Sequence, residues 1–189
     1  MSVILLSANA NSAIMNFDVS AKGNSVLGGV RYNTGLNFFA GESIRGSVNE
    51  NDYWSANPSR GLFWSNANGL VGDVFATGTD ESGKAEGVRI GRQYPRTWSH
   101  NGLTTTFGTL VGEINNNYFV LGTDFDIVAP ESGILSLFYW DNVADDNAGL
   151  VTVSIDNNAA VSNVPVPAAV WLFGSGLIGL ISVNRKKLS

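Results

Sequence analysis

The segments ILSLFYW (residues 134–140) and LVTVSI (residues 150–155) alternate in the way that antiparallel β-strands do. One face of each segment is apolar: it carries Leu135, Leu137 and Tyr139 in the first, and Val151, Val153 and Ile155 in the second. Successive side chains of a strand point to opposite faces of the sheet. Both segments are therefore predicted to be half-buried strands with one face on a hydrophobic core.

Short segments of the same kind recur along the chain, separated by Gly, Asn and Asp, at residues 17–21, 30–39, 71–77, 108–114 and 117–122. The 22 glycines and the 14% of charged residues favour turns and strands over long helices. The 189 residues suit one domain with appendages. We predict an all-β fold, a single antiparallel β-sandwich of the jelly-roll kind over residues 14–163.

Charge is divided unevenly along the chain. All 16 acidic residues lie within residues 1–163, together with eight of the 11 cations, so this part carries a net charge of −8. An acidic body argues against nucleic acid as a partner, because binding to phosphates requires a basic surface. It suits calcium or neutral ligands. The absence of cysteine excludes disulfides and thiolate metal sites.

The segment VPVPAAVWLFGSGLIGLISVNRKKLS, residues 164–189, differs from the polar body. Residues 168–183 carry no charge, and a helix of that length would span roughly 24 Å, which makes a short membrane anchor. Trp171 lies near one end, and a basic cluster lies beyond the other, which predicts a transmembrane helix with the body outside. A core helix is the alternative, but the segment has no polar stripe.

This tail resembles the PEP-CTERM sorting signal of Gram-negative bacteria in the order of its three parts. A short proline motif precedes WLFGSGLIGL, and a basic stop follows: Val164, Pro165, Val166 and Pro167, then Arg185, Lys186 and Lys187. The family motif is Pro-Glu-Pro, so Val166 replaces its acidic residue. The resemblance implies an exosortase-type processing enzyme as a partner, transient anchoring in the inner membrane, and delivery to the cell surface or the exopolysaccharide matrix.

At the other end, residues 1–13, MSVILLSANANSA, have half the features of a signal peptide. A short apolar run precedes Ala8-Asn9-Ala10, which suits a signal peptidase, but no basic residue comes before it. We therefore interpret residues 1–13 as a partial signal peptide, with a disordered N-terminal tail as the alternative.

Motifs for catalysis are weak. Residues 78–84 have the spacing of a phosphate-binding loop, but Ala85 stands where a hydroxyl should hold magnesium, so an inter-strand loop is predicted. His100, the single histidine, has no recognisable triad around it, and Asp124 and Asp126 on one strand face are expected to be solvated. We expect no enzyme, with an extracellular hydrolase as a remote alternative.

The body is similar to the bacterial calcium-dependent galactose-binding lectins over residues 101–155. NGLTTTFGTLVGEI, APESGILSLFYWD and DNAGLVTVSI carry the resemblance, and residues 32–48 match an earlier strand pair. It implies a galactose-binding-like sandwich, with calcium held by Asp141, Asp146 and Asn147. It further implies the backbone near Trp54 as a ligand, and His100 or Asn101 as a sugar contact.

Residues 141–147 support calcium binding on chemical grounds as well. Carboxylate and amide oxygens are concentrated in residues 141–147, and calcium prefers such hard ligands. The indoles of Trp140 and Trp54 are expected to stack on a sugar. An Asx-rich hairpin turn ending at Gly149 explains the same residues without an ion. Two functions remain open: binding of extracellular polysaccharide through calcium, or a structural matrix protein with no small ligand.

We predict that the tail is removed in the native host, because a marginal span with a basic stop suits a temporary anchor. Mass spectrometry of the secreted protein should find no peptides that cover residues 171–187. Their recovery intact from secreted material would argue against the sorting hypothesis.

Overall fold

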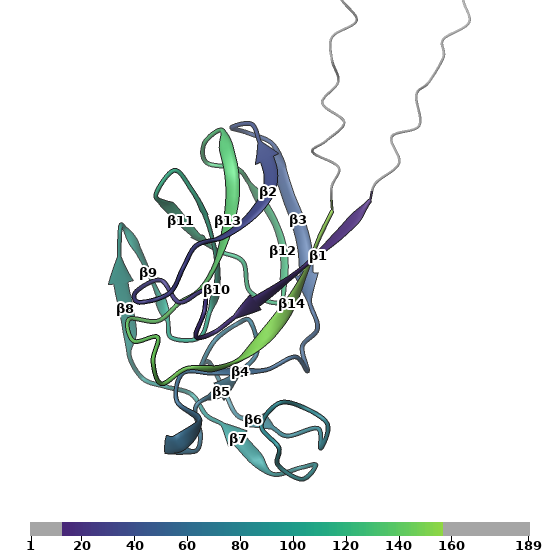
Figure 1. Ribbon diagram of the computed structural model, residues 1–189, viewed down its shortest axis with the longest axis vertical. Helices are drawn as coiled ribbons and strands as arrows, with labels where there is room; N and C mark the ends of the chain where they lie inside the picture. Colours follow the sequence, from purple (N-terminus) through teal and green to yellow (C-terminus); the bar gives the residue numbers. More distant parts are fainter. Residues whose placement is uncertain (1–12, 157–189) are drawn as a thin grey trace, which may run out of the picture.

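The computed structural model describes residues 13–156, which form an antiparallel β-sandwich (Figure 1). The predicted signal segment, apart from its last residue, lies outside the described residues, and so does the whole sorting segment 164–189. Within residues 13–156, no helix has the length and apolar character needed to cross a membrane.

Each layer of the sandwich is an antiparallel sheet. The first has the order β12 (Asp124–Val128), β3 (Ser43–Val48), β14 (Ala148–Asp156), β4 (Trp54–Ser55) and β5 (Trp64–Ser65), with β1 (Ile14–Ser20) on the other edge of β14. The second has the order β11 (Asn117–Val120), β10 (Leu110–Ile114), β13 (Gly133–Tyr139) and β2 (Tyr32–Phe38). Two small ribbons join β6 (Val74–Phe75) to β7 (Arg89–Gly91), and β8 (Thr97–His100) to β9 (Leu103–Thr106). A short 3₁₀ turn, η1 (Pro58–Arg60), follows β4.

The core lies between the two sheets and contains the predicted strand faces. The six alternating residues of β13 and β14 are fully buried in one cluster: Leu135, Leu137, Tyr139, Val151, Val153 and Ile155. Burying a side chain of this size stabilises the fold by about 1.5–3 kcal/mol. The strand prediction is therefore confirmed for the segments that define the sandwich.

Strand β13 differs from the prediction because both of its faces are buried from Leu135 onward. Phe138 on its outer face, and Trp140 just after it, lie in a second cluster beneath the ribbon of β8 and β9. The Trp98 ring of β8 lies 4.8 Å from that of Trp140. In contrast, Thr152 and Ser154 on the outer face of β14 stay partly exposed, as predicted. Residues 32–48 do form two strands, but β2 and β3 belong to opposite sheets.

Side chains complete the hydrogen bonding along one edge of β14. This edge pairs with β4 at residues 148–149 and with β3 at residues 153–155, which leaves a gap between them. The backbone N–H of Leu150 donates to Glu81 Oε2 at 3.0 Å, and that of Thr152 donates to Asp52 Oδ2 at 2.7 Å. Two carboxylates thus satisfy N–H groups that would otherwise lack a partner strand.

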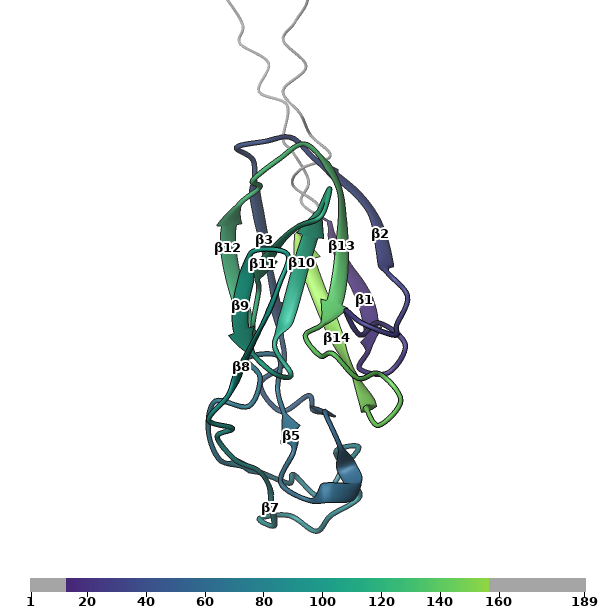
Figure 2. The same cartoon turned by 90° about the vertical axis from the view of Figure 1, so that its left-hand side faces the viewer.

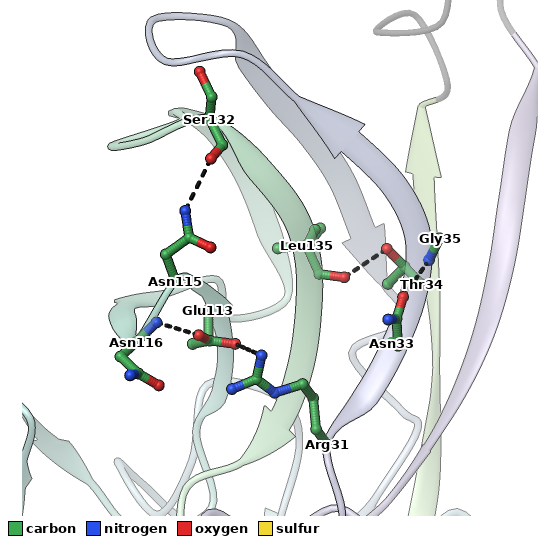
Figure 3. A network of polar contacts seen from close by, with 9 residues as sticks. All are labelled: Arg31, Asn33, Thr34, Gly35, Glu113, Asn115, Asn116, Ser132 and Leu135. Atoms are coloured by element: carbon green, nitrogen blue, oxygen red, sulfur yellow. Dashed lines mark hydrogen bonds and ion pairs between the residues drawn. The ribbon is translucent and has the colours of Figure 1, made fainter.

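A buried carboxylate also organises the second sheet (Figure 3). Glu113 of β10 has no exposed surface, accepts a hydrogen bond from the Asn116 backbone N–H, and lies 3.4 Å from Arg31 Nη1. Asn115 and Asn116 have positive φ of 52° and 67°, as a tight hairpin turn requires. Glu113 therefore links the turn between β10 and β11 to the start of β2.

We predict that Leu135→Ala lowers the free energy of unfolding by about 2–5 kcal/mol, because it leaves a cavity in a fully packed core. Its neighbour Ile134 is 45% exposed, so Ile134→Ala should cost less than about 1 kcal/mol. Urea unfolding of both variants measures the difference. Equal losses would mean that β13 does not present this face to the core.

Candidate functional site

The loop between β13 and β14 crosses one end of the sandwich, the end that also carries η1 (Figure 2). Its first residues are held by their backbone. The Asp141 carbonyl accepts hydrogen bonds from the Leu27 N–H at 3.2 Å and from Ser25 Oγ at 3.1 Å. Trp140 is held by backbone bonds to Gly108 and Thr109. Asp141 is therefore fixed in place just beyond the end of a buried strand.

The carboxylate of Asp141 is buried, with 4% of the residue exposed. Its Oδ1 accepts hydrogen bonds from the backbone N–H groups of Asn142 at 2.6 Å and Val143 at 3.2 Å. Burial raises the pKa of Asp141 from 3.8 to about 6, and the nearby charge of Asp146 adds to this effect, while the two backbone donors oppose it.

Asp146 and Asn147 come from the far end of the same loop. Asp146 is exposed, and its Oδ2 accepts a hydrogen bond from Asn57 Nδ2 at 2.7 Å. Asn147 is buried beside Asp141, and its Nδ2 donates to the Ala21 carbonyl at 3.4 Å. Its Oδ1 is buried and has no hydrogen-bond partner among the described residues. An unpaired buried amide oxygen costs free energy unless a cation or donor approaches it.

These residues fit a calcium ion in the type of their donor atoms. Asp141, Asp146 and Asn147 bring two carboxylates and one amide oxygen to one loop, and all are hard oxygen ligands. Within residues 13–156, no three Asp, Glu or His residues gather at a metal's distance, so the set contains only two charged ligands. Few charged ligands imply weak calcium binding.

A cavity of about 420 Å³ opens beside this loop. Asp141 and Asp146 line one part of it. An aromatic wall of Phe63, Tyr94 and Phe107 lines another, with the ring centroid of Tyr94 5.6 Å from that of Phe63 and 5.8 Å from that of Phe107. The remaining lining includes Asn57 and two arginines, Arg60 and Arg96. The volume is in the range of small-molecule sites, roughly 300–1,000 Å³.

The structure corrects the expected stacking of tryptophans on a sugar. The Trp54 and Trp140 side chains are fully buried. Trp54 Nε1 donates to the Gly108 carbonyl at 2.9 Å, and its ring packs edge-on against Tyr139. Trp140 packs beneath Trp98. Neither indole can present a face to a ligand, so for Trp54 only the backbone role remains a prediction.

His100 and Asn101 lie at the tip of the ribbon of β8 and β9, where Asn101 has a positive φ of 42°. The His100 ring stacks on Trp98 at 5.3 Å. Neither residue lines the cavity that contains Asp141. The structure therefore does not bring these two predicted sugar contacts together with the predicted calcium ligands.

A second cavity, of about 660 Å³, lies along the open edge of β14. Its carboxylates are already engaged. Asp52 and Glu81 accept the β14 backbone bonds described above, and Asp80 accepts hydrogen bonds from Thr77 and Ser82. Residues 78–84 are confirmed as an inter-strand loop, with Asp80 holding its turn. The carboxylates that line this second cavity thus serve the hydrogen bonding of the fold itself.

The predicted solvated face of β12 is also confirmed. Asp124 and Asp126 are exposed, and Asp126 forms a salt bridge of 3.0 Å with Arg45. Neither lines either of the two cavities described. The cavity residues that sequence analysis missed include Asn57, Arg60, Phe63, Tyr94, Arg96 and Phe107. They come from separate loops, and no spacing in the sequence marks them as neighbours.

No protein-family model matches the chain, and no curated protein matches it. Among solved structures, the chain is similar to one described as "EclA N-terminal domain; PllA-like lectin". The TM-score is 0.46 and the sequence identity 22%, over 75% of this chain and 93% of that chain. A likeness at this level assigns neither a family nor a ligand to the chain.

We predict that Asp141→Asn is more stable than the unsubstituted protein at pH 7 in the presence of a chelator, by about 1–3 kcal/mol. The pKa of Asp141 is 3.8 in the unfolded chain and about 6 when folded, so the folded state binds more protons between these values. The free energy of unfolding contributed by this group therefore falls as the pH rises through that window.

Urea unfolding at pH 4 and pH 7 measures this effect. The amide variant keeps an oxygen that accepts from Asn142 and Val143, so its advantage should shrink towards pH 4. A variant less stable than the unsubstituted protein at pH 7 would contradict the prediction.

Proposed function

We propose that the β-sandwich binds extracellular carbohydrate in the cavity beside the β13–β14 loop, through a calcium ion held by Asp141, Asp146 and Asn147. The observation that carries the proposal concerns Asn147, whose side chain lies beside the buried Asp141 carboxylate and whose buried Oδ1 has no hydrogen-bond partner among residues 13–156. Both groups are destabilising as they stand, and a cation relieves both. When bound, calcium supplies open coordination positions for vicinal hydroxyls.

The chain's own residues prepare this site. The Asn142 and Val143 N–H groups hold Oδ1 of Asp141, which fixes the direction of the carboxylate. Asn57 does the same for Asp146 from a different loop. Side chains held in this way lose less conformational entropy when a ligand binds.

The aromatic wall supports a sugar as the ligand. Sugars have apolar C–H faces as well as hydroxyls, and aromatic rings pack against such faces. Phe63, Tyr94 and Phe107 are partly exposed and line the cavity that Asp141 also lines. One cavity therefore offers a polar side for hydroxyls and an apolar side for the ring, as ligand sites commonly do.

We also propose that the protein works outside the cell, on the evidence of the tail sequence 164–187. Its resemblance to a PEP-CTERM signal suits a protein sorted by an exosortase-type enzyme to the surface or the polysaccharide matrix. Polysaccharide would then be the ligand available to it, and the body would act as a binding module rather than as an enzyme.

We predict that calcium binds the chain and raises its melting temperature at millimolar concentrations, by linkage. Asp146→Ala should weaken calcium binding by about tenfold or more, because it removes one of only two charged ligands. Asp145→Ala is the matched control, since its side chain is fully exposed and does not line the cavity. Calorimetric titration with calcium, then with galactosides, measures both steps.

The result that would overturn the proposal is an absence of calcium heat together with an unchanged melting temperature. The structural matrix protein without a small ligand would then be the better hypothesis. An equal loss of affinity in the Asp145 and Asp146 variants would also count against this site.

A further inference from the structure

Positive charge is scarce in the folded body, and half of it is paired. All 16 acidic residues lie within residues 13–156, together with eight of the 11 cations. Four of these eight form ion pairs with carboxylates: Lys22, Arg31, Arg45 and Arg89. Only the four other cations of residues 13–156 have a charge that no carboxylate pairs, so each is a large share of the positive charge available to a ligand.

Two of the four remaining cations line one cavity. Arg60 and Arg96 both lie on the lining of the cavity that contains Asp141, and neither forms an ion pair within residues 13–156. They are 36 residues apart in the sequence and come from different loops. The other two, Lys84 and Arg92, do not line it.

Arg60 is held in place by its backbone. Its N–H donates to Asn57 Oδ1 at 3.1 Å, and the Asn57 Nδ2 donates to Asp146. The same asparagine thus positions the backbone of Arg60 and the side chain of Asp146. Arg96 comes directly before the first residue of β8 and two residues after Tyr94 of the aromatic wall, and these two elements position its backbone.

No hydrogen bond occupies either guanidinium group within the described residues, so the donors of both remain available. A guanidinium group binds carboxylate and sulfate through charge-assisted, often bidentate hydrogen bonds. A net charge of −8 would otherwise keep an anionic ligand away from this body. Two unpaired arginines at the cavity remove this barrier locally.

We propose that the saccharide bound in this cavity is acidic, with a carboxylate held by Arg60 and Arg96 while its hydroxyls face Asp141 and Asp146. This inference rests on the proposed carbohydrate function and names the class of sugar. A uronic acid unit has the required carboxylate, hydroxyls and apolar face on one ring. A sulfated sugar shares the anionic chemistry and is distinguished by the test.

The test compares an acidic sugar with its ester, which lacks the negative charge and carries one extra methyl group. Methyl galacturonoside and its methyl ester are titrated into the full chain in millimolar calcium, with methyl galactoside 6-sulfate as a third ligand. The acid should bind about tenfold more tightly than the ester, as expected for a charge-assisted contact. A stronger preference for the sulfate than for the carboxylate would overturn the uronic acid assignment.

Arg60→Gln and Arg96→Gln should each remove most of the preference for the acid over the ester while leaving calcium binding unchanged. Arg92→Gln is the matched control, because Arg92 is exposed, forms no ion pair among the described residues and does not line the cavity. Thermal melting of all three variants checks that they fold. The acid's affinity should also fall with added salt more steeply than the ester's.

Equal affinity for acid and ester, or an unchanged preference in both cavity variants, would overturn this inference and leave neutral carbohydrate binding intact. Absence of calcium heat and of binding by any of the three ligands would instead overturn the proposed function, and this inference with it. The two failures are therefore distinguishable in one set of titrations.

Discussion

Strands β13 and β14 are consecutive in the chain but belong to opposite sheets, and the rest of the molecule depends on the way they enclose one core. Leu137 and Val153 represent the two buried rows that meet there. Because each row belongs to a different layer, the residues between the strands must cross the end of the sandwich. That crossing is the segment that contains Asp141 and Asn147, so the position of the candidate site follows from the topology of the core.

Parts of the chain without regular structure hold this crossing in place. Residues 24–27 bond the backbone at the end of β13 and just after it, and residues 108–109 bond Trp140 from the other side. At the start of β14, Gly149 has φ of +85°, and an added Cβ would lie 2.9 Å from Trp54 Cα. The close approach of β4 therefore requires glycine there. Backbone held on both sides keeps the buried carboxylate of Asp141 near the exposed carboxylate of Asp146.

Carboxylates that accept hydrogen bonds or pair with a cation have three different uses in this protein. Glu113 pairs with Arg31 and caps a hairpin turn, whereas Asp52 and Glu81 accept N–H groups where β14 lacks a neighbouring strand. Asp141 also accepts backbone donors, but it lines a cavity and lies beside Asn147, whose buried Oδ1 has no partner in the described part of the chain. This difference, rather than acidity alone, separates a candidate ligand site from carboxylates that stabilise the fold.

The sequence by itself determined the fold class and the loop that contains the candidate site. Alternation in residues 134–140 and 150–155 identified the two core strands, and the density of Asp and Asn identified the crossing between them, because both signals are local in the chain. The same local reasoning misjudged Trp54 and Trp140, since a ribbon or a loop distant in sequence covers their rings. Only the tertiary structure decided which residues share the cavity: Arg60, Tyr94 and Asp141 meet there because separate loops converge at one end of the sandwich, and no spacing along the chain records that convergence.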